Sequence, residues 1–320
     1  MSPIIEIQGL CKHYGKRKAV DDVNMTIESG EIFGLVGPNG AGKTTTMRML
    51  VTLLKPDKGE IRVGGYSVRK SPREVRRQIG FMPDSFGAYG DLTVQEYLDF
   101  FGACYSIAPA QRASLIKDLL DLVDIGHRRD DMVDTLSTGL KQRLGLARVL
   151  IHDPSVLVLD EPASGLDPRA RVEIRELLLE VARLGKTIIF SSHILADVSE
   201  LCTRVAIMES GRLAALGALD QLTERVMPHR LLRISLLKET TIENAQAMLT
   251  AYPGISAVRT QEGLGRAEWL SLEADFGGDD KALQTLLADM LQQGLPVVHF
   301  SEDTKNLEEV FMRTTKGIVS

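Results

Sequence analysis

Short apolar runs bounded by glycine dominate the first part of the chain and predict the strands of a parallel sheet. Residues 4–36 alternate apolar and polar positions in short segments, and residues 32–36 (IFGLV) are wholly apolar. Similar runs follow at residues 156–160 (VLVLD) and 187–191 (TIIFS), and each is typical of a strand that is buried on both faces. Between these two, residues 169–184 carry apolar positions at helical spacing. Strand, helix and strand in this order predict a parallel α/β sheet.

A helical segment interrupts the α/β pattern. Thr93 and Glu96 form a capping box ahead of an apolar stripe, and pairs of leucine and isoleucine repeat at helical spacing further along. We therefore predict a helical insert over about residues 85–140, inside an α/β domain that spans residues 1–224.

The last hundred residues follow a different pattern. The alternation of apolar positions predicts strand, helix, two strands, helix and strand, and Thr240 and Glu243 are expected to cap the first of these helices. A short helix at residues 306–315 ends the chain. The order βαββαβ is that of a ferredoxin-like split unit, so we predict a separate α+β domain at residues 225–320. The alternative is an irregular α+β tail that only stabilises the body.

Composition excludes several classes of protein. Of the 320 residues, 44% are hydrophobic and 25% are charged, which is the profile of a globular protein with a sizeable core. The net charge of −5 does not favour a nucleic-acid partner. Cys11, Cys104 and Cys202 have neither metal-binding nor disulfide spacing, which indicates a reducing compartment. No signal pattern opens the chain and no apolar run approaches roughly 20 residues, so we expect a cytoplasmic chain that does not itself cross a membrane.

The segment between the first buried strand and the next helix carries the strongest chemical signal. It matches the pattern G-x-x-x-x-G-K-[ST], whose glycines let backbone N–H groups point at phosphate oxygens while the helix adds its positive N-terminal end. Lys43 is expected to neutralise the β- and γ-phosphates, and the Thr44 hydroxyl to ligate Mg²⁺. The predicted nucleotide-binding residues of this loop are Gly37, Pro38, Asn39, Gly40, Ala41, Gly42, Lys43, Thr44 and Thr45.

Two adjacent carboxylates, Asp160 and Glu161, follow an apolar strand. Such a pair is costly to bury unless something binds it. Beside a phosphate-binding loop, Asp160 is expected to hold Mg²⁺, and Glu161 to orient or deprotonate the attacking water. The alternative is a strand end with two solvated acids.

Further segments, in unbroken order with these, resemble ATP-binding-cassette (ABC) ATPases over about residues 4–220. Residues 136–143 (LSTGLKQR) look like the family's signature loop, and residues 164–167 (SGLD) look like its D-loop. His193 matches the switch histidine and Tyr14 matches the aromatic that stacks on adenine. The segments GFMPD, DEPASGLDP and LEEVF are similar to ATPase subunits of ABC-2 type drug exporters, whose membrane-spanning part is a separate polypeptide.

The resemblance implies an enzyme that hydrolyses ATP with Mg²⁺ and works as a homodimer. In the family, the residues that match Ser137, Thr138 and Gly139 reach the γ-phosphate of the opposite subunit, so that two chains sandwich two nucleotides head to tail. Asp167 belongs to the D-loop, and His193 is expected at the γ-phosphate with Lys43 and Glu161. The structural alternatives are an ordinary helix cap at Ser137, a core histidine at His193 and a packed aromatic at Tyr14.

The chain departs from the family pattern at Asp84. The family has a glutamine there, which senses Mg²⁺ and the attacking water, whereas this chain has the segment IGFMPDSFG. Aspartate is a methylene shorter and charged, yet it can still reach Mg²⁺ through water. The resemblance therefore implies a metal site formed by Thr44, Asp160 and Asp84.

These features together predict the energising subunit of an exporter at the inner face of the cell membrane, with a separate multi-spanning permease as partner. The helical insert would contact that partner. The candidates for the docking surface are Phe81, Met82, Phe86 and Tyr89, although ordinary packing explains them equally well. The alternative function is a soluble ABC-type clamp that is not coupled to transport. The single cassette and the lack of sustained heptads disfavour that alternative.

Overall fold

The computed structural model describes residues 3–84, 87, 91–226, 230–238, 242–261, 269–303 and 307–315. The chain divides into two compact units. The first unit runs to Leu219 and takes in Thr314, and the second unit is Asp220–Arg313. The sequence pattern places this boundary after residue 224, whereas in the structure the second unit begins at the start of helix α8 (Leu219–Val226).

A six-stranded sheet forms the centre of the first unit. Its strands are β3 (Ile32–Val36), β6 (Ile79–Met82), β7 (Val156–Asp160), β8 (Thr187–Ser192), β9 (Arg204–Glu209) and β10 (Arg212–Ala218). They lie in the order β10-β9-β3-β8-β7-β6, and all neighbours are parallel except β10, which pairs antiparallel with β9. Every residue of β3, β7 and β8 is buried, as the apolar runs in these strands predict. Because parallel strands end at the same edge of a sheet, the residues that follow β3, β7 and β8 meet there.

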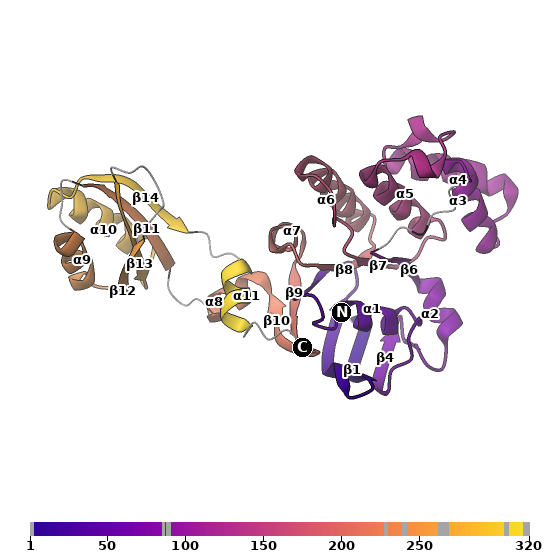
Figure 1. The fold of residues 1–320 in the computed structure, drawn as a ribbon, viewed down its shortest axis with the longest axis horizontal. Coiled ribbons are helices and arrows are strands. Elements are labelled where there is room, and N and C mark those ends of the chain that lie inside the picture. Colours follow the sequence, from indigo (N-terminus) through magenta and orange to yellow (C-terminus); the bar gives the residue numbers. More distant parts are fainter. Residues whose placement is uncertain are drawn as a thin grey trace. The chain divides into compact units, whose positions relative to one another are not determined.

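An antiparallel sheet lies beside the parallel one and shares its core. Its strands are β1 (Pro3–Tyr14), β2 (Arg17–Glu28), β4 (Lys58–Val63) and β5 (Tyr66–Ser67), in the order β2-β1-β4-β5. Helix α1 (Lys43–Leu50) lies close to this sheet in Figure 1. One apolar cluster contains Ile5 and Val20 of the antiparallel sheet, Met47 of α1, and Phe33 and Val158 of the parallel sheet. This shared core fixes the end of the β1–β2 hairpin next to the start of α1.

The helical insert forms a layer of its own within the first unit, as predicted (Figure 1). It contains α3 (Val94–Cys104) and α4 (Pro109–Leu122), and α5 (Thr138–Leu150) begins where the insert ends. The capping box at the start of α3 is confirmed, because the Thr93 hydroxyl accepts from the Glu96 N–H at 3.2 Å and the Thr93 N–H donates to Glu96 Oε2 at 2.9 Å. The remaining helices of this unit are α2 (Pro72–Gln78), α6 (Pro168–Arg183) and α7 (Leu195–Leu201).

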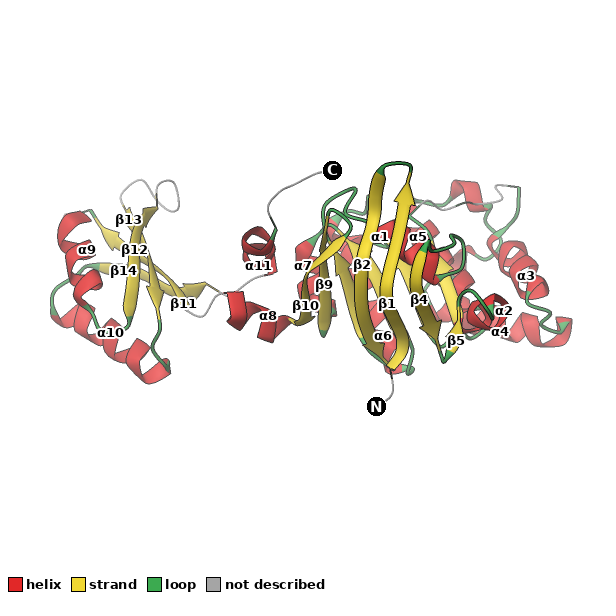
Figure 2. Ribbon diagram, turned by 90° about the horizontal axis from the view of Figure 1, so that it is seen from below, coloured by secondary structure: helices red, strands yellow, loops and turns green. Residues whose placement is uncertain are grey.

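The second unit contains the predicted βαββαβ order. Its elements are β11 (Arg230–Leu237), α9 (Ile242–Ala251), β12 (Ile255–Gln261), β13 (Trp269–Phe276), α10 (Asp280–Gln292) and β14 (Val297–Asp303), with α8 before them and α11 (Leu307–Thr314) after. The sheet is antiparallel, in the order β12-β13-β11-β14, and α9 and α10 cover one of its faces (Figures 1 and 2). The predicted cap residue Thr240 lies outside the described residues. None of the helices in the described part of the chain has the length and apolar character needed to cross a membrane.

Candidate active site

The loop between β3 and α1 is built around glycines that no other residue could replace. A Cβ on Gly37 would lie 2.3 Å from the carbonyl oxygen of Met208, and a Cβ on Gly42 would lie 2.5 Å from that of Ala19. Gly42 also has a φ of +105° and is the N-cap of α1, where no side chain caps the helix. The first N–H groups of α1 therefore have no side-chain acceptor and are available to an anion.

Lys43 folds back onto this loop. Its ammonium donates to the carbonyl oxygens of Gly37 at 2.6 Å and Pro38 at 3.3 Å, and it lies 3.8 Å from Glu161 Oε1. The side chain is only 6% exposed. Burial lowers the pKa of Lys43, while the charges of Glu161 and Asp160 oppose that shift. A phosphate group that entered here would meet a buried cation held by two neutral carbonyls and one nearby acid.

Asp160 is held from two elements at the end of β7. It is 2% exposed, and its Oδ1 accepts from the Ser191 hydroxyl at 2.6 Å and from the Thr44 hydroxyl at 3.3 Å. Ser191 in turn accepts from the Glu161 N–H at 3.0 Å. The hydroxyl of Ser191 thus joins the two adjacent acids. Sequence reasoning missed this residue, since a serine in a buried strand carries no motif.

Glu161 lies between a lysine and a histidine. Its backbone is left-handed, with a φ of +53°, which is strained for a residue with a side chain. Its Oε2 lies 2.7 Å from His193 Nδ1, while its Oε1 faces Lys43. His193 follows β8, so β7 and β8 bring the histidine and the acid together at the sheet edge.

The first cavity, of about 510 Å³, opens over the loop. Its lining includes Asn39, Gly40, Gly42, Lys43, Thr44, Thr45, Asp84 and Glu161, together with Tyr14, Arg17 and Ala19 from the β1–β2 hairpin. Tyr14 is 51% exposed. Arg17 donates through Nη2 to the Gly40 carbonyl at 3.4 Å, so this cation lies across the top of the loop. The sequence predicts residues 16–18 (KRK) to be a solvated turn near the nucleotide, and the contact of Arg17 with the loop adds to that prediction.

A carboxylate fixes the strand end that carries Tyr14. Asp57 accepts from Lys12 Nζ at 2.8 Å and from the backbone N–H of His13 at 2.7 Å. These hydrogen bonds, with that of Lys12 the stronger influence, lower the pKa of Asp57 to about 2. Lys12 Nζ also lies 5.9 Å from the centre of the Tyr14 ring. The aromatic is therefore held at the cavity by its neighbours in β1.

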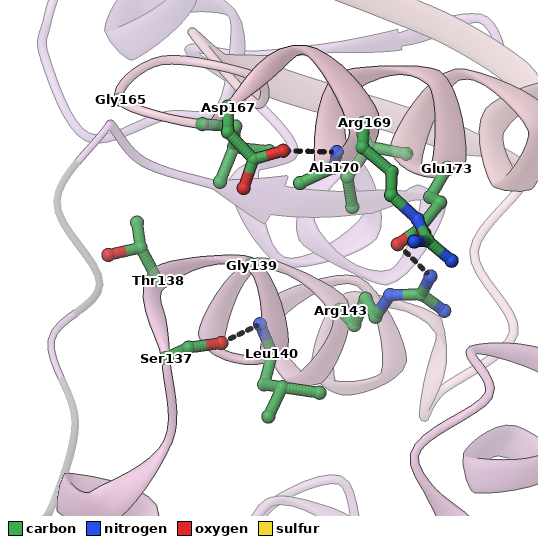
Figure 3. A pocket seen from close by; sticks show the side chains of 12 residues that line it. Ser137, Thr138, Gly139, Leu140, Arg143, Gly165, Asp167, Arg169, Ala170 and Glu173 are labelled. Atoms are coloured by element: carbon green, nitrogen blue, oxygen red, sulfur yellow. Dashed lines mark hydrogen bonds and ion pairs between the residues drawn. The ribbon is translucent and has the colours of Figure 1, made fainter.

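The predicted signature and D-loop residues line a second cavity, also of about 510 Å³. Ser137 is the N-cap of α5 and accepts from the Leu140 N–H at 3.4 Å, and Asp167 is the N-cap of α6 and accepts from the Ala170 N–H at 2.9 Å (Figure 3). Thr138 and Gly139 line the same cavity. The starts of α5 and α6 therefore face one cavity, and none of its lining residues also lines the first cavity.

The oxygen donors of the first cavity fit Mg²⁺. Thr44 and Asp160 already lie within hydrogen-bond distance of each other, and the Asp84 carboxylate lines the same cavity. Mg²⁺ is usually bound by one or two carboxylates together with substrate phosphates and water, rather than by a protein cage. This donor set matches that pattern.

Comparison with known proteins agrees with this geometry. Residues 20–164 match the family described as ABC transporter. The linearmycin resistance ATP-binding protein LnrL of Bacillus subtilis (strain 168) is 30% identical over 98% of this chain and 98% of its own length. The bacitracin transport ATP-binding protein BcrA of Bacillus licheniformis is 40% identical over 70% of this chain and 73% of its own. A solved structure of the ATP-binding subunit of an ABC transporter superposes with a TM-score of 0.64 at 30% identity, over 69% of this chain and 92% of that one.

The chain therefore belongs to the ATP-binding subunits of ABC transporters, a family of enzymes that hydrolyse ATP. The predicted fold class is confirmed by the same comparisons.

Proposed function

We propose that the chain binds ATP with Mg²⁺ in the first cavity, closes head to tail on a second copy and drives a separate membrane-spanning permease in export. The observation that carries the proposal is the meeting of Lys43, Thr44, Asp160 and Glu161 at one edge of the parallel sheet. A buried cation, an uncapped helix start and two acids together suit the binding and cleavage of a phosphoanhydride.

The nucleotide is held by the loop and the hairpin. Tyr14 stacks on adenine, and the backbone N–H groups of residues 37–45 surround the phosphates. Lys43 exchanges its two carbonyl acceptors for β- and γ-phosphate oxygens. Thr44 and Asp160 would hold Mg²⁺, with Asp84 reaching it through water, and the ion would neutralise charge on the phosphates.

Glu161 orients the attacking water and accepts its proton. The strained backbone at Glu161 and its hydrogen bond to Ser191 aim the side chain away from the strand and toward the first cavity. His193 holds Oε2 of this acid and contacts the γ-phosphate from the neighbouring strand end. Glu161 and His193 are thus each held in a fixed orientation, as catalysis by orientation of the reacting groups requires.

The second cavity receives the nucleotide of the opposite subunit. Ser137, Thr138 and Gly139 start one helix and Asp167 caps another, so both helix N-termini offer partial positive charge to a γ-phosphate. A phosphate clamped from both sides holds two chains together, and its loss on hydrolysis releases them.

Coupling to a permease uses a third cavity, of about 590 Å³, which we name the docking groove. Its lining residues are Arg48, Leu53, Phe81, Pro83, Phe101, Tyr105, Arg148, Val149 and His152. The groove combines aromatic walls with two arginines, which suits an apolar segment that carries acidic residues. Of the predicted docking residues, Phe81 lines this groove, while Phe86 and Tyr89 lie outside the described residues. Met82 is buried, which agrees with the packing alternative for this residue.

The export direction rests on relatives. The name of one relative, from Ralstonia nicotianae, is Nod factor export ATP-binding protein I, and it is 33% identical over 98% of this chain and 94% of its own length. The proposed location is the inner face of the cell membrane, where the permease would hold the chain.

Co-purification tests the permease partner. Tagged full-length chain is isolated from detergent-solubilised membranes, and bound polypeptides are identified by mass spectrometry. We expect a stoichiometric multi-spanning polypeptide that is lost with Leu53→Asp, since Leu53 is 65% exposed in the groove. The matched control is Tyr66→Asp, an exposed apolar residue on β5 that should retain the partner. Recovery of soluble partners alone would favour the free-standing clamp.

A further inference from the structure

The two helices that open the second cavity are joined by an ion pair deeper in their length. Arg143 lies six residues after the cap Ser137, and Glu173 lies six residues after the cap Asp167. Arg143 Nη2 donates to Glu173 Oε2 at 2.8 Å (Figure 3). At a rise of 1.5 Å per residue, the pair lies about 9 Å below each cap. Because the ion pair lies at the same distance along each helix from its N-cap, it holds Ser137 and Asp167 side by side.

The guanidinium of Arg143 also forms a hydrogen bond to the end of α4 in the helical insert. Its Nη1 donates to the carbonyl oxygen of Val123, the C-cap of α4, at 2.8 Å and lies 3.7 Å from Asp124 Oδ2. The Arg143 side chain is 12% exposed. One planar cation on α5 therefore joins the end of α4 to the middle of α6.

Glu173 is held as an anion by two arginines. Its second oxygen accepts from Arg169 Nε at 3.2 Å, one turn earlier on the same helix. Arg143 first, and then Arg169, lower the pKa of Glu173. The acid thus stays ionised over the physiological pH range, so the link to Arg143 remains charge-assisted.

The helix starts also lie near each other at Gly139. A Cβ on Gly139 would lie 3.7 Å from the Ala170 Cβ and 4.0 Å from Leu166 Cδ2. Even a methyl side chain at position 139 would therefore be in ordinary van der Waals contact with Ala170, which places the starts of the two helices next to each other, while Arg143 and Glu173 link the helices further down. Two points of contact along the same pair of helices define their relative angle.

We propose that Arg143 is a positioning residue that, through Glu173, holds the signature loop and the D-loop as one rigid face for the nucleotide of the opposite subunit. The inference rests on the proposed head-to-tail dimer and deepens it. Lysine donates from a single nitrogen, so it lacks the planar fork whose Nη1 and Nη2 reach the Val123 carbonyl and the Glu173 carboxylate in fixed directions. Arg143→Lys therefore keeps the charge and removes the alignment.

The test separates binding of ATP by one chain from closure of two chains. In full-length chain carrying Glu161→Gln, ATP affinity is measured at a chain concentration too low for dimers, and ATP-dependent dimerisation is measured by analytical ultracentrifugation. With Arg143→Lys added, we expect dimerisation to weaken about tenfold, while ATP affinity of the monomer stays within about twofold. Glu173→Gln should weaken dimerisation equally, and the double variant no further, because each change breaks the same link.

A matched control removes a similar link elsewhere in the insert. Arg112 donates through Nε to Asp99 at 2.8 Å and through Nη1 to the Ile107 carbonyl at 3.3 Å. Arg112→Lys therefore removes the same kind of fork, joining α3 to α4, away from the second cavity. Dimerisation of this control should match that of the parent.

Each other outcome contradicts a stated part of the account. If the Glu161→Gln parent dimerises but Arg143→Lys and Glu173→Gln dimerise as tightly, the inference is wrong and the proposed dimer stands. If the parent itself stays monomeric with ATP, the proposed dimer is wrong and the inference falls with it. If monomer ATP affinity drops as much as dimerisation, Arg143 has only a general structural role, which also overturns the inference.

Discussion

Ser191 holds both acids of the first cavity, so replacing it tests how that site is organised. Ser191→Ala leaves the buried Asp160 without its 2.6 Å hydrogen bond and the Glu161 N–H without its 3.0 Å acceptor. A hydrogen bond to a charged group contributes about 1.5–3 kcal/mol, and an orphaned buried donor costs about 1–3 kcal/mol. Because both effects share one hydroxyl, we expect the free energy of unfolding to fall by about 3 kcal/mol rather than by their sum.

The same loss should appear in turnover. If the bond to Asp160 contributes about 1.5–3 kcal/mol to the transition state, kcat falls about 10- to 100-fold. Urea denaturation gives the free energy of unfolding, and phosphate release at saturating ATP and Mg²⁺ gives kcat.

Thr187→Val supplies the control for Ser191→Ala. Thr187 lies on the same strand, is fully buried, and accepts from the Gly30 N–H at 2.9 Å, at the opposite end from the site. We expect this isosteric change to lower stability by about 1–3 kcal/mol and to leave kcat within about twofold. The reasoning is refuted if Ser191→Ala turns over ATP as fast as Thr187→Val does.

Two further predictions concern the hairpin that borders the first cavity. Arg17→Ala should weaken ATP binding about 3- to 10-fold in isothermal titration calorimetry and leave adenosine binding unchanged, because an exposed cation acts on phosphate charge. The control Lys18→Ala loses an ion pair with Asp21 and should bind ATP normally. Equal losses of ATP and adenosine binding in Arg17→Ala would contradict the role of Arg17. Asp57→Asn should lower thermal stability at neutral pH, because the pKa of Asp57 is depressed from 3.8 to about 2 and the ionised carboxylate stabilises the fold above the higher value. As pH falls from 3.8 through about 2, the advantage of the wild-type chain should shrink in calorimetric melting, and a difference that stays constant over this window would be inconsistent with the assigned hydrogen bonds.

Strands β3, β7 and β8 of the central sheet could be predicted because each contains a continuous apolar run. Once β3, β7 and β8 are taken as parallel neighbours, the rule that their carboxyl ends meet brings the loop of Lys43 toward Glu161. The order of elements in the second unit could be predicted because alternation and helical spacing of apolar residues are local properties of a sequence.

The contacts made across strands could not be predicted in this way. Ser191 faces Asp160 because β7 and β8 pair in that register, and a single sequence does not encode which residue lies opposite which. Phe81 and Met82 are equally apolar neighbours on β6, yet Phe81 lines the docking groove while Met82 is buried, a difference that their hydrophobicity does not reveal. Arg17 reaches Gly40 because the hairpin folds over the loop, so its position in a basic turn near the nucleotide did not by itself predict this contact.

The most direct test of the account is the rate of ATP hydrolysis by purified full-length chain with Glu161→Gln, measured alongside its affinity for ATP. Glutamine keeps the size and polarity of the side chain but cannot accept the proton of the attacking water. The account predicts that ATP affinity stays within about threefold and that turnover falls at least about 100-fold, the contribution expected of a general base. Turnover at the wild-type rate would contradict the assignment of Glu161 and, with it, the mechanism proposed for the first cavity.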